Sequence, residues 1–169
     1  MRYYPFFGLL VLLLVLTWGV ECTPVLASSE EVQIEKVEVQ FLQRNPVVLL
    51  AVGDKAISIF VDPTVAGSIQ GALTGEKFPR PLSHDLMQSI LKTYEVHVER
   101  VFITLRDGVF YGTLTLSRNG QHQLFDSRSS DAIALAVHFQ SPIFVERDLL
   151  DSEGKIMRFG KETKKDFEL

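Results

Sequence analysis

The sequence predicts an α+β fold in which antiparallel strand meanders are combined with three short helices. Segments with alternating apolar and polar residues follow one another at short intervals, as they do in meanders. Two of the intervening turns are Asp-Gly and Asn-Gly pairs, which are strong hairpin signals. The connections are too short for the crossovers of a parallel, doubly wound sheet. We therefore expect sheet-on-helix or sheet-on-sheet packing within one domain.

The first meander and its helix occupy the segment after residue 31. The predicted strands span residues 32–42, 47–52 and 56–61. The apolar positions of the first strand change phase near Glu35 and Lys36, where a bulge would reconcile them. Asp62 and Pro63 then predict the N-cap and first residue of a short helix. Gly75 is suited to end that helix.

A second helix and a second meander follow. Ser83 is the predicted N-cap of this helix, and its predicted inward face consists of Leu86, Ile90, Leu91 and Tyr94. The predicted strands span residues 96–105, 109–117 and 121–126, with a phase ambiguity around Glu99 and Arg100. A nearly all-apolar helix over residues 132–139 and a strand over 142–146 complete the fold. Three strands followed by a helix thus occur twice, which suggests an internal duplication.

The two ends of the chain differ in composition from this body. Arg2 precedes an apolar run over residues 9–16, and Val25, Leu26 and Ala27 resemble a signal peptidase site. We expect residues 1–27 to be an export signal or, alternatively, an uncleaved N-terminal membrane anchor. Residues 28–151 form the predicted domain, and residues 152–169 are expected to be a charged C-terminal tail. The protein is accordingly predicted to be periplasmic, secreted or membrane-anchored.

Composition limits the classes of function. The 169-residue chain is 46% hydrophobic, with a sequence pI near 5.6 and a net charge of −4. A surface that binds nucleic acid must therefore be a local basic cluster or depend on a metal. Cys22 is the single cysteine, which excludes an intrachain disulfide and a multi-cysteine metal site.

The start of the apolar helix is the best candidate for a site. Arg128 precedes it, and Ser127, Ser129, Ser130 and Asp131 surround its first turn. In a functional interpretation, Arg128 binds a phosphate and Asp131 binds a divalent cation or acts as a general base. In a structural interpretation, the same residues cap the helix and form a local ion pair.

The first turn of the Ser83 helix carries a second candidate pair. His84 and Asp85 are interpreted either as a metal-assisting pair or as capping and surface residues. Lys77 and Arg80 lie on the preceding proline-rich loop and are candidate substrate-binding residues. His138, like His97 and His122, has no partner at metal-site spacing and is expected to be an ordinary histidine.

Three segments in this order resemble the bifunctional nuclease domain family. They are KFPRPLSHDLMQSIL, VERVFITLRDGVFYGTLTL and SRSSDAIALAVHFQSPIFV, and the similarity extends over residues 32–151. The resemblance implies a self-associating α+β domain with nuclease activity on DNA and RNA. By motif match it indicates Arg80, His84, Asp85, Asp107, Arg128, Ser130 and Asp131. The family's W-I-G-x-x-E-A-like segment reads FVDPTVAG here, so Val65 or Ala66 stands in place of its acid.

Three hypotheses of function follow. In the first, the protein is a nuclease in which Asp85 and Asp131 hold Mg²⁺ or Mn²⁺, Arg128 stabilises developing charge and His84 transfers a proton. Lys77, Arg80 and Ser130 then contact the nucleic acid. In the second, the domain is a non-catalytic, self-associating binding or scaffold module of the cell envelope. A third and weaker hypothesis is a sensor of small anions at a helix N-terminus.

Overall fold

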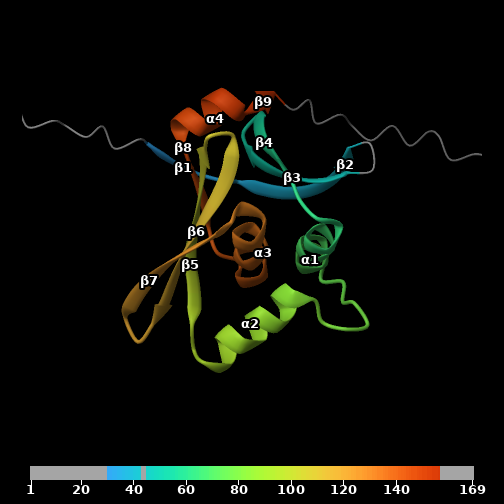
Figure 1. Cartoon of the computed structure of the whole chain (residues 1–169), viewed down its shortest axis with the longest axis vertical. Coiled ribbons are helices and arrows are strands. Elements are labelled where there is room, and N and C mark those ends of the chain that lie inside the picture. Colours follow the sequence, from blue (N-terminus) through green and yellow to red (C-terminus); the bar gives the residue numbers. More distant parts are fainter. Residues whose placement is uncertain (1–29, 43–44, 157–169) are drawn as a thin grey trace, which may run out of the picture.

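The computed structural model describes residues 30–42 and 45–156, which fold into two sheets and four helices (Figure 1). The larger sheet contains, in spatial order, β1 (Glu31–Gln33), β8 (Ile143–Glu146), β5 (His97–Arg106), β6 (Val109–Arg118) and β7 (Gln121–Arg128). The smaller sheet contains β2 (Lys36–Leu42), β3 (Asn45–Val52), β4 (Lys55–Phe60) and β9 (Lys155–Ile156). The helices are α1 (Pro63–Thr74), α2 (Ser83–Thr93), α3 (Ser129–Phe139) and α4 (Arg147–Glu153).

The predicted order of two meanders, each followed by a helix, is confirmed. Strands β2, β3 and β4 lead into α1, strands β5, β6 and β7 lead into α3, and α2 lies between the two units. Each meander belongs to its own sheet. The larger sheet is mixed. After β7 the chain forms α3 and then re-enters the same sheet as β8, which pairs parallel to β5. Helix α3 occupies the centre, in contact with α1, α2 and the larger sheet (Figure 1).

The predicted phase change near Glu35 marks the point where the chain passes from one sheet to the other. The backbone N–H of Ile34 donates to the carbonyl of Ile143 at 2.8 Å, in the larger sheet. The next N–H, of Glu35, donates to the carbonyl of Ala51 at 2.9 Å, in the smaller sheet. The two apolar phases therefore belong to two strands, β1 and β2, rather than to one bulged strand. The predicted irregularity in β5 is a true bulge between Val98 and Arg100.

Both predicted hairpin turns are confirmed. Asp107 and Gly108 have φ angles of 51° and 76°, and Asn119 and Gly120 have φ angles of 52° and 75°. Positive φ at both central residues is the signature of a type I′ turn, whose twist matches that of the flanking strands.

Helix α3 is buried along most of its length, as predicted. Ala132, Ile133, Ala134 and Ala136 have no exposed surface. The helix also lies unusually close to β6, because a Cβ atom added to Gly112 would be 2.5 Å from the Cβ of Ala132. Residue 112 must therefore lack a side chain for the start of α3 to reach its position on the sheet.

The predicted inward face of α2 is confirmed only for Leu91, which packs against the core. Leu86, Ile90 and Tyr94 are exposed, whereas His84, which we had expected at an exposed edge, is 5% exposed. Helical periodicity identifies residues that share a face but not which face packs, and α2 packs on α3 through the edge that carries His84. Ser83 is the first helical residue, and the N-cap is Leu82.

The C-terminal part of the described chain contains a helix that the sequence did not predict. Leu149 and Leu150 of α4 are buried, and β9 pairs with β4. The described residues thus form four helices rather than the expected three. The predicted N-terminal signal or anchor and most of the predicted tail lie outside the described residues. Within residues 30–42 and 45–156, no helix is long and apolar enough to cross a membrane.

Candidate active site

A pocket of about 660 Å³ opens where the starts of α1, α2 and α3 meet. Its polar lining comes from the start of α1 and the residue before it, from α2, from the end of β7 and from the start of α3. It consists of Asp62, Thr64, Ser83, His84, Ser127, Arg128 and Asp131. Val65, Met87, Leu114 and Leu135 supply much of its apolar lining. We call this cavity the Arg128 pocket.

Arg128 connects two carboxylates at this pocket. Its Nε donates to Oδ2 of Asp131 at 2.8 Å, and its Nη2 donates to Oδ1 of the same carboxylate at 3.0 Å. Its Nη1 donates to Oδ2 of Asp62 at 3.3 Å. The side chain of Arg128 remains 63% exposed, so the guanidinium is open to a ligand from solvent. An arginine held in two parallel hydrogen bonds has a fixed orientation.

His84 reaches the same carboxylate from α2. Its Nε2 lies 3.3 Å from Oδ1 of Asp131, although 47 residues separate the two in the sequence. The other ring nitrogen, Nδ1, has no hydrogen-bond partner among the described residues. Among the described residues, every fully buried side-chain nitrogen has a hydrogen-bond partner. Because Nδ1 of His84 has none, this nitrogen is not fully buried and retains contact with solvent.

The electrostatics keep the Arg128–Asp131 pair ionised. The hydrogen bonds from Arg128 hold the pKa of Asp131 below its ordinary value of 3.8, although partial burial opposes this shift. Hydrogen bonding to Asp131 likewise raises the pKa of Arg128 above its ordinary value. A carboxylate with so low a proton affinity is suited to orienting His84 and Arg128 rather than to accepting a proton.

Comparison of the sequence with known proteins identifies the family of this chain. The profile described as "Bifunctional nuclease domain" matches residues 47–158, a range that includes every residue of the Arg128 pocket. The chain belongs to the bifunctional nuclease domain family. Two relatives in this comparison are uncharacterized proteins of Mycobacterium tuberculosis, MT1877 and Rv1829. Each is 32% identical over 130 residues, which cover 75% of this chain and 77% of the relative.

The domain brings together some of the sequence-predicted site residues and separates others. His84, Arg128 and Asp131 share the Arg128 pocket. Asp85 lines a neighbouring cavity, where its Oδ2 accepts a hydrogen bond from the backbone N–H of Leu82 at 2.8 Å. Lys77 lines that neighbouring cavity too, Arg80 is exposed on the same loop, and Ser130 is buried in the first turn of α3.

Two further residues lie at the site and were not among the predicted site residues. Asp62 was expected to cap α1, but it makes no capping side-chain hydrogen bond and contacts Arg128 instead. The ring of His138 stacks with that of His84, with 6.3 Å between centroids and 25° between planes. Residues seven apart lie on one face of a helix, so the spacing of Asp131 and His138 could have indicated that both face α2.

The predicted divalent-cation site does not fit the side chains in the described ranges. Both carboxylate oxygens of Asp131 accept hydrogen bonds from Arg128, and Asp85 lines a different cavity. Hard cations of this kind require several oxygen ligands around one point. In the described part of the domain, no three or more His, Cys, Asp or Glu side chains are arranged to hold a metal ion. We therefore assign no chemical step to a cation shared by Asp85 and Asp131.

Proposed function

We propose that this bifunctional nuclease domain hydrolyses phosphodiester bonds in DNA and RNA, with the Arg128 pocket as its active site. The observation that carries the proposal is the shared pocket of Arg128, His84 and Asp131, contributed by separate elements and open to solvent. A phosphate-binding guanidinium beside a histidine can supply charge stabilisation and proton transfer to phosphodiester hydrolysis. Family membership supports the same class of reaction.

Arg128 can bind a phosphate without releasing either carboxylate. A guanidinium has five N–H donors, and the contacts to Asp131 and Asp62 use three of them. The remaining donors face the exposed side of the group, where they would neutralise charge on the phosphate oxygens as the bond breaks.

His84 would transfer the proton. Water attacks the phosphorus and gives up one proton to Nδ1 of His84, and the P–O bond to the sugar breaks. The departing sugar oxygen takes up a proton from solvent and the imidazolium returns its proton to solvent, so that one water is added across the P–O bond. Asp131 orients the ring through Nε2 and stabilises the imidazolium that forms. The same carboxylate also holds Arg128, which fixes the distance between the proton acceptor and the phosphate-binding group.

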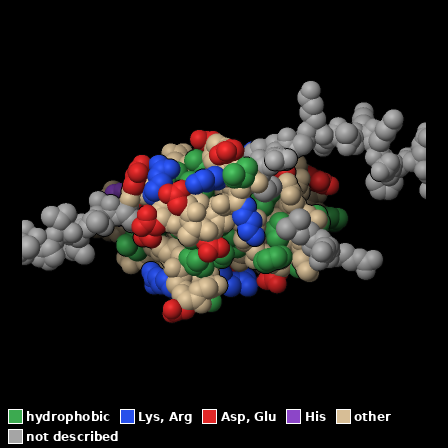
Figure 2. Space-filling model, turned by 90° about the horizontal axis from the view of Figure 1, so that it is seen from above, with side chains coloured by type: hydrophobic (Ala, Val, Ile, Leu, Met, Phe, Trp, Pro, Cys, Tyr) green, Lys and Arg blue, Asp and Glu red, His purple; other side chains and the backbone are tan. Residues whose placement is uncertain are grey.

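We further propose that Lys77, Arg80 and Ser130 bind the nucleic acid outside the cleaved bond. The two cations lie on the exposed loop between α1 and α2. The face shown in Figure 2 carries Lys and Arg interspersed with Asp and Glu, so a basic surface is not spread over that side of the molecule. Binding is therefore expected to involve few phosphate contacts and to weaken only modestly with salt.

The test is cleavage of labelled single-stranded and duplex DNA and RNA. Wild type and Asp131→Ala are compared with Mg²⁺, with Mn²⁺ and with a chelator. Assistance by a divalent cation that binds with the substrate phosphates, rather than one shared by Asp85 and Asp131, is part of the proposal. Activity that survives the chelator would remove the cation from the proposal. A wild-type rate no higher than that of Asp131→Ala would remove the nuclease claim.

The exposed stripe of α2 favours self-association, and with it a second candidate function. Leu86, Ile90 and Tyr94 follow one another at four-residue spacing, and Phe125 on the edge strand β7 is also exposed. Contiguous exposed apolar surface marks an interaction site.

We propose a homo-oligomer formed through this surface. Ile90→Glu is expected to lower the mass measured by analytical ultracentrifugation, whereas Phe60→Glu, on β4, is the control. An oligomer without any cleavage activity would indicate the scaffold module instead.

We also propose that the protein is exported, or anchored by residues 1–27. The charge and apolar run described above support this proposal. Fractionation of cells that express the full chain, followed by N-terminal sequencing, tests it. A cytosolic protein that keeps Met1 would contradict the proposal.

A further inference from the structure

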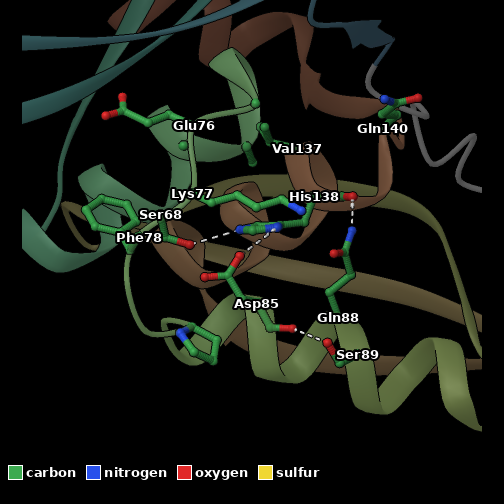
Figure 3. Close-up of a pocket in the computed structure, with 14 residues that line it drawn as sticks. Ser68, Glu76, Lys77, Phe78, Asp85, Gln88, Ser89, Val137, His138 and Gln140 are labelled. Carbon is green, nitrogen blue, oxygen red and sulfur yellow. Dashed lines mark hydrogen bonds and ion pairs between the residues drawn. The ribbon is translucent and has the colours of Figure 1, made fainter.

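Three polar side chains from three helices are linked by successive contacts in the cavity beside the Arg128 pocket, with His138 in contact with both of the others (Figure 3). The hydroxyl Oγ of Ser68, on α1, is 2.9 Å from Nε2 of His138, on α3. The other ring nitrogen, Nδ1 of His138, is 3.9 Å from Oδ1 of Asp85, on α2. The cavity measures about 470 Å³, and all three residues line it.

This order of groups is the one that activates a serine hydroxyl. An imidazole accepts the proton of the hydroxyl at one nitrogen, and a carboxylate orients the ring through the other. The Ser68–His138 distance is that of a hydrogen bond. The His138–Asp85 distance is longer, but such contacts are commonly loose before substrate binds and tighten in the complex.

His138 is suited to accept a proton at neutral pH. Burial lowers the pKa of its imidazole, because the charged form loses hydration. The charged and titratable groups around it act in both directions, since Asp85 raises that pKa whereas His84 and Lys92 lower it. The backbone carbonyl of His138 accepts a hydrogen bond from the Gln88 amide, which ties this end of α3 to α2.

The loop after α1 forms a wall of the cavity beside Ser68. A Cβ added to Gly67 would be 3.2 Å from Cζ of Phe78, and one added to Gly71 would be 2.9 Å from the carbonyl oxygen of Glu76. Glycine inside a helix costs about 1 kcal/mol relative to alanine, so two glycines four residues apart need a reason. Here they admit the loop, which covers the helix next to Ser68 and encloses the cavity.

The charges of the cavity select among possible substrates. Lys77 is the one Lys or Arg among its lining residues, and Glu76 and Asp85 oppose it. The interior of the cavity therefore does not favour an anionic small molecule. The volume lies in the range of small-molecule pockets.

We propose that Ser68 is the nucleophile of a second hydrolytic site, which acts on small uncharged carboxylic esters. Oγ of Ser68 attacks the carbonyl carbon while its proton passes to Nε2 of His138. The carbon–oxygen bond to the alcohol breaks, and the alcohol leaves with that proton. Water then attacks the acyl group, gives a proton to His138, and the Ser68 oxygen departs and regains it. One water is consumed for each ester, and a carboxylic acid and an alcohol are released.

A fluorophosphonate probe tests this proposal with the full chain. Ser68 is expected to displace fluoride and gain the mass of the phosphonyl group, which peptide mapping places at residue 68. Ser68→Ala is expected to abolish the label, and His138→Gln to slow labelling by about 100-fold, the contribution of a general base. Ser89→Ala is the matched control, because Ser89 lines the same cavity but its hydroxyl donates to the backbone carbonyl of Asp85. This variant should be labelled like wild type.

A second variant keeps the test decisive if Ser68→Ala fails to fold. Ser68→Cys retains a nucleophile of similar size, and iodoacetamide should alkylate the introduced thiol faster with His138 present than with His138→Gln. A wild-type chain that is unlabelled at Ser68, or a labelling rate that is indifferent to His138, would overturn the proposal. The rates of p-nitrophenyl butyrate hydrolysis should rank the variants in the same order as the rates of labelling.

The two proposed activities can fail independently. Arg128→Ala is expected to retain the label at Ser68 while nucleic-acid cleavage is lost, and Ser68→Ala is expected to retain cleavage while the label is lost. Loss of cleavage in Ser68→Ala that is still folded by circular dichroism would place Ser68 in the nuclease reaction and contradict a separate ester site.

Discussion

His84 contacts Asp131 across the packed surfaces of α2 and α3, with 3.3 Å between Nε2 and Oδ1. The same carboxylate is held by the exposed guanidinium of Arg128 through two hydrogen bonds. One ionised group thus positions a buried imidazole and a solvent-facing cation. The helix packing that buries His84 therefore also determines the geometry of the proposed phosphate site.

Replacing Arg128 by alanine is expected to lower the rate of phosphodiester cleavage by about 100-fold or more, the usual effect of removing one group that stabilises transition-state charge. Arg128→Lys should recover little of the loss, because an ammonium cannot hold Asp131 through two parallel bonds. Arg147→Ala is the control, since Arg147 forms a comparable exposed pair with Glu30. Kinetics on a labelled oligonucleotide measure the effect, and equal rates for Arg128→Ala and Arg147→Ala would contradict the assignment.

The ionised state of Asp131 is expected to appear in the pH dependence of stability. Because Arg128 depresses the pKa of folded Asp131 below 3.8, this group stabilises the fold above its unfolded pKa, and the contribution is lost as pH falls through the folded pKa. Urea unfolding of wild type and Asp131→Asn at about pH 7 and about pH 2 measures it. Wild type should be the more stable at neutral pH, and the difference should shrink in acid. A difference that grows in acid would show that the pKa shift has the opposite sign.

The elements that the sequence predicts well are those determined by local chemistry. Asp107 with Gly108 and Asn119 with Gly120 form their turns because these residues tolerate positive φ, whatever surrounds them. The bulge near Glu99 was visible because alternation changes phase there. The assignment of β1 and β2 to separate sheets was not visible, because the pairing partners, Ile143 and Ala51, are specified by long-range contacts.

The candidate site was predictable only in part, because local chemistry identifies its polar residues but long-range packing decides which of them meet. Polar residues at helix starts pointed to His84, Arg128 and Asp131, and the structure places these in one pocket. The pairing of Asp85 with His138 was missed because it depends on which face of α2 packs against α3. The apolar stripe of α2 suggested that the opposite face would pack. In the structure most of that stripe is exposed, and His84 is buried at the edge of α2 that packs against α3.

The close approach of β6 and α3 predicts that residue 112 tolerates no side chain. Gly112→Ala would place a methyl group 2.5 Å from the Cβ of Ala132 and 3.2 Å from the carbonyl oxygen of Arg128. We expect a loss of about 1–3 kcal/mol in the free energy of unfolding, as is typical of overpacking. Adding Ala132→Gly removes the nearer contact, so the double variant should lose less than the sum of the single losses. Chemical denaturation of the four proteins tests this, and additive losses would mean that β6 and α3 do not touch at this point.

Helix α4 is expected to hold the two sheets together, because it contacts both β4 and β8. Leu150 is 2% exposed, and truncating a leucine so buried removes apolar contacts and leaves a cavity. Leu150→Ala should therefore lower the free energy of unfolding by about 2–5 kcal/mol. Leu73→Ala is the matched control, since Leu73 is 43% exposed and its truncation leaves no enclosed space. If urea denaturation shows equal losses for both variants, α4 is not part of the folded core.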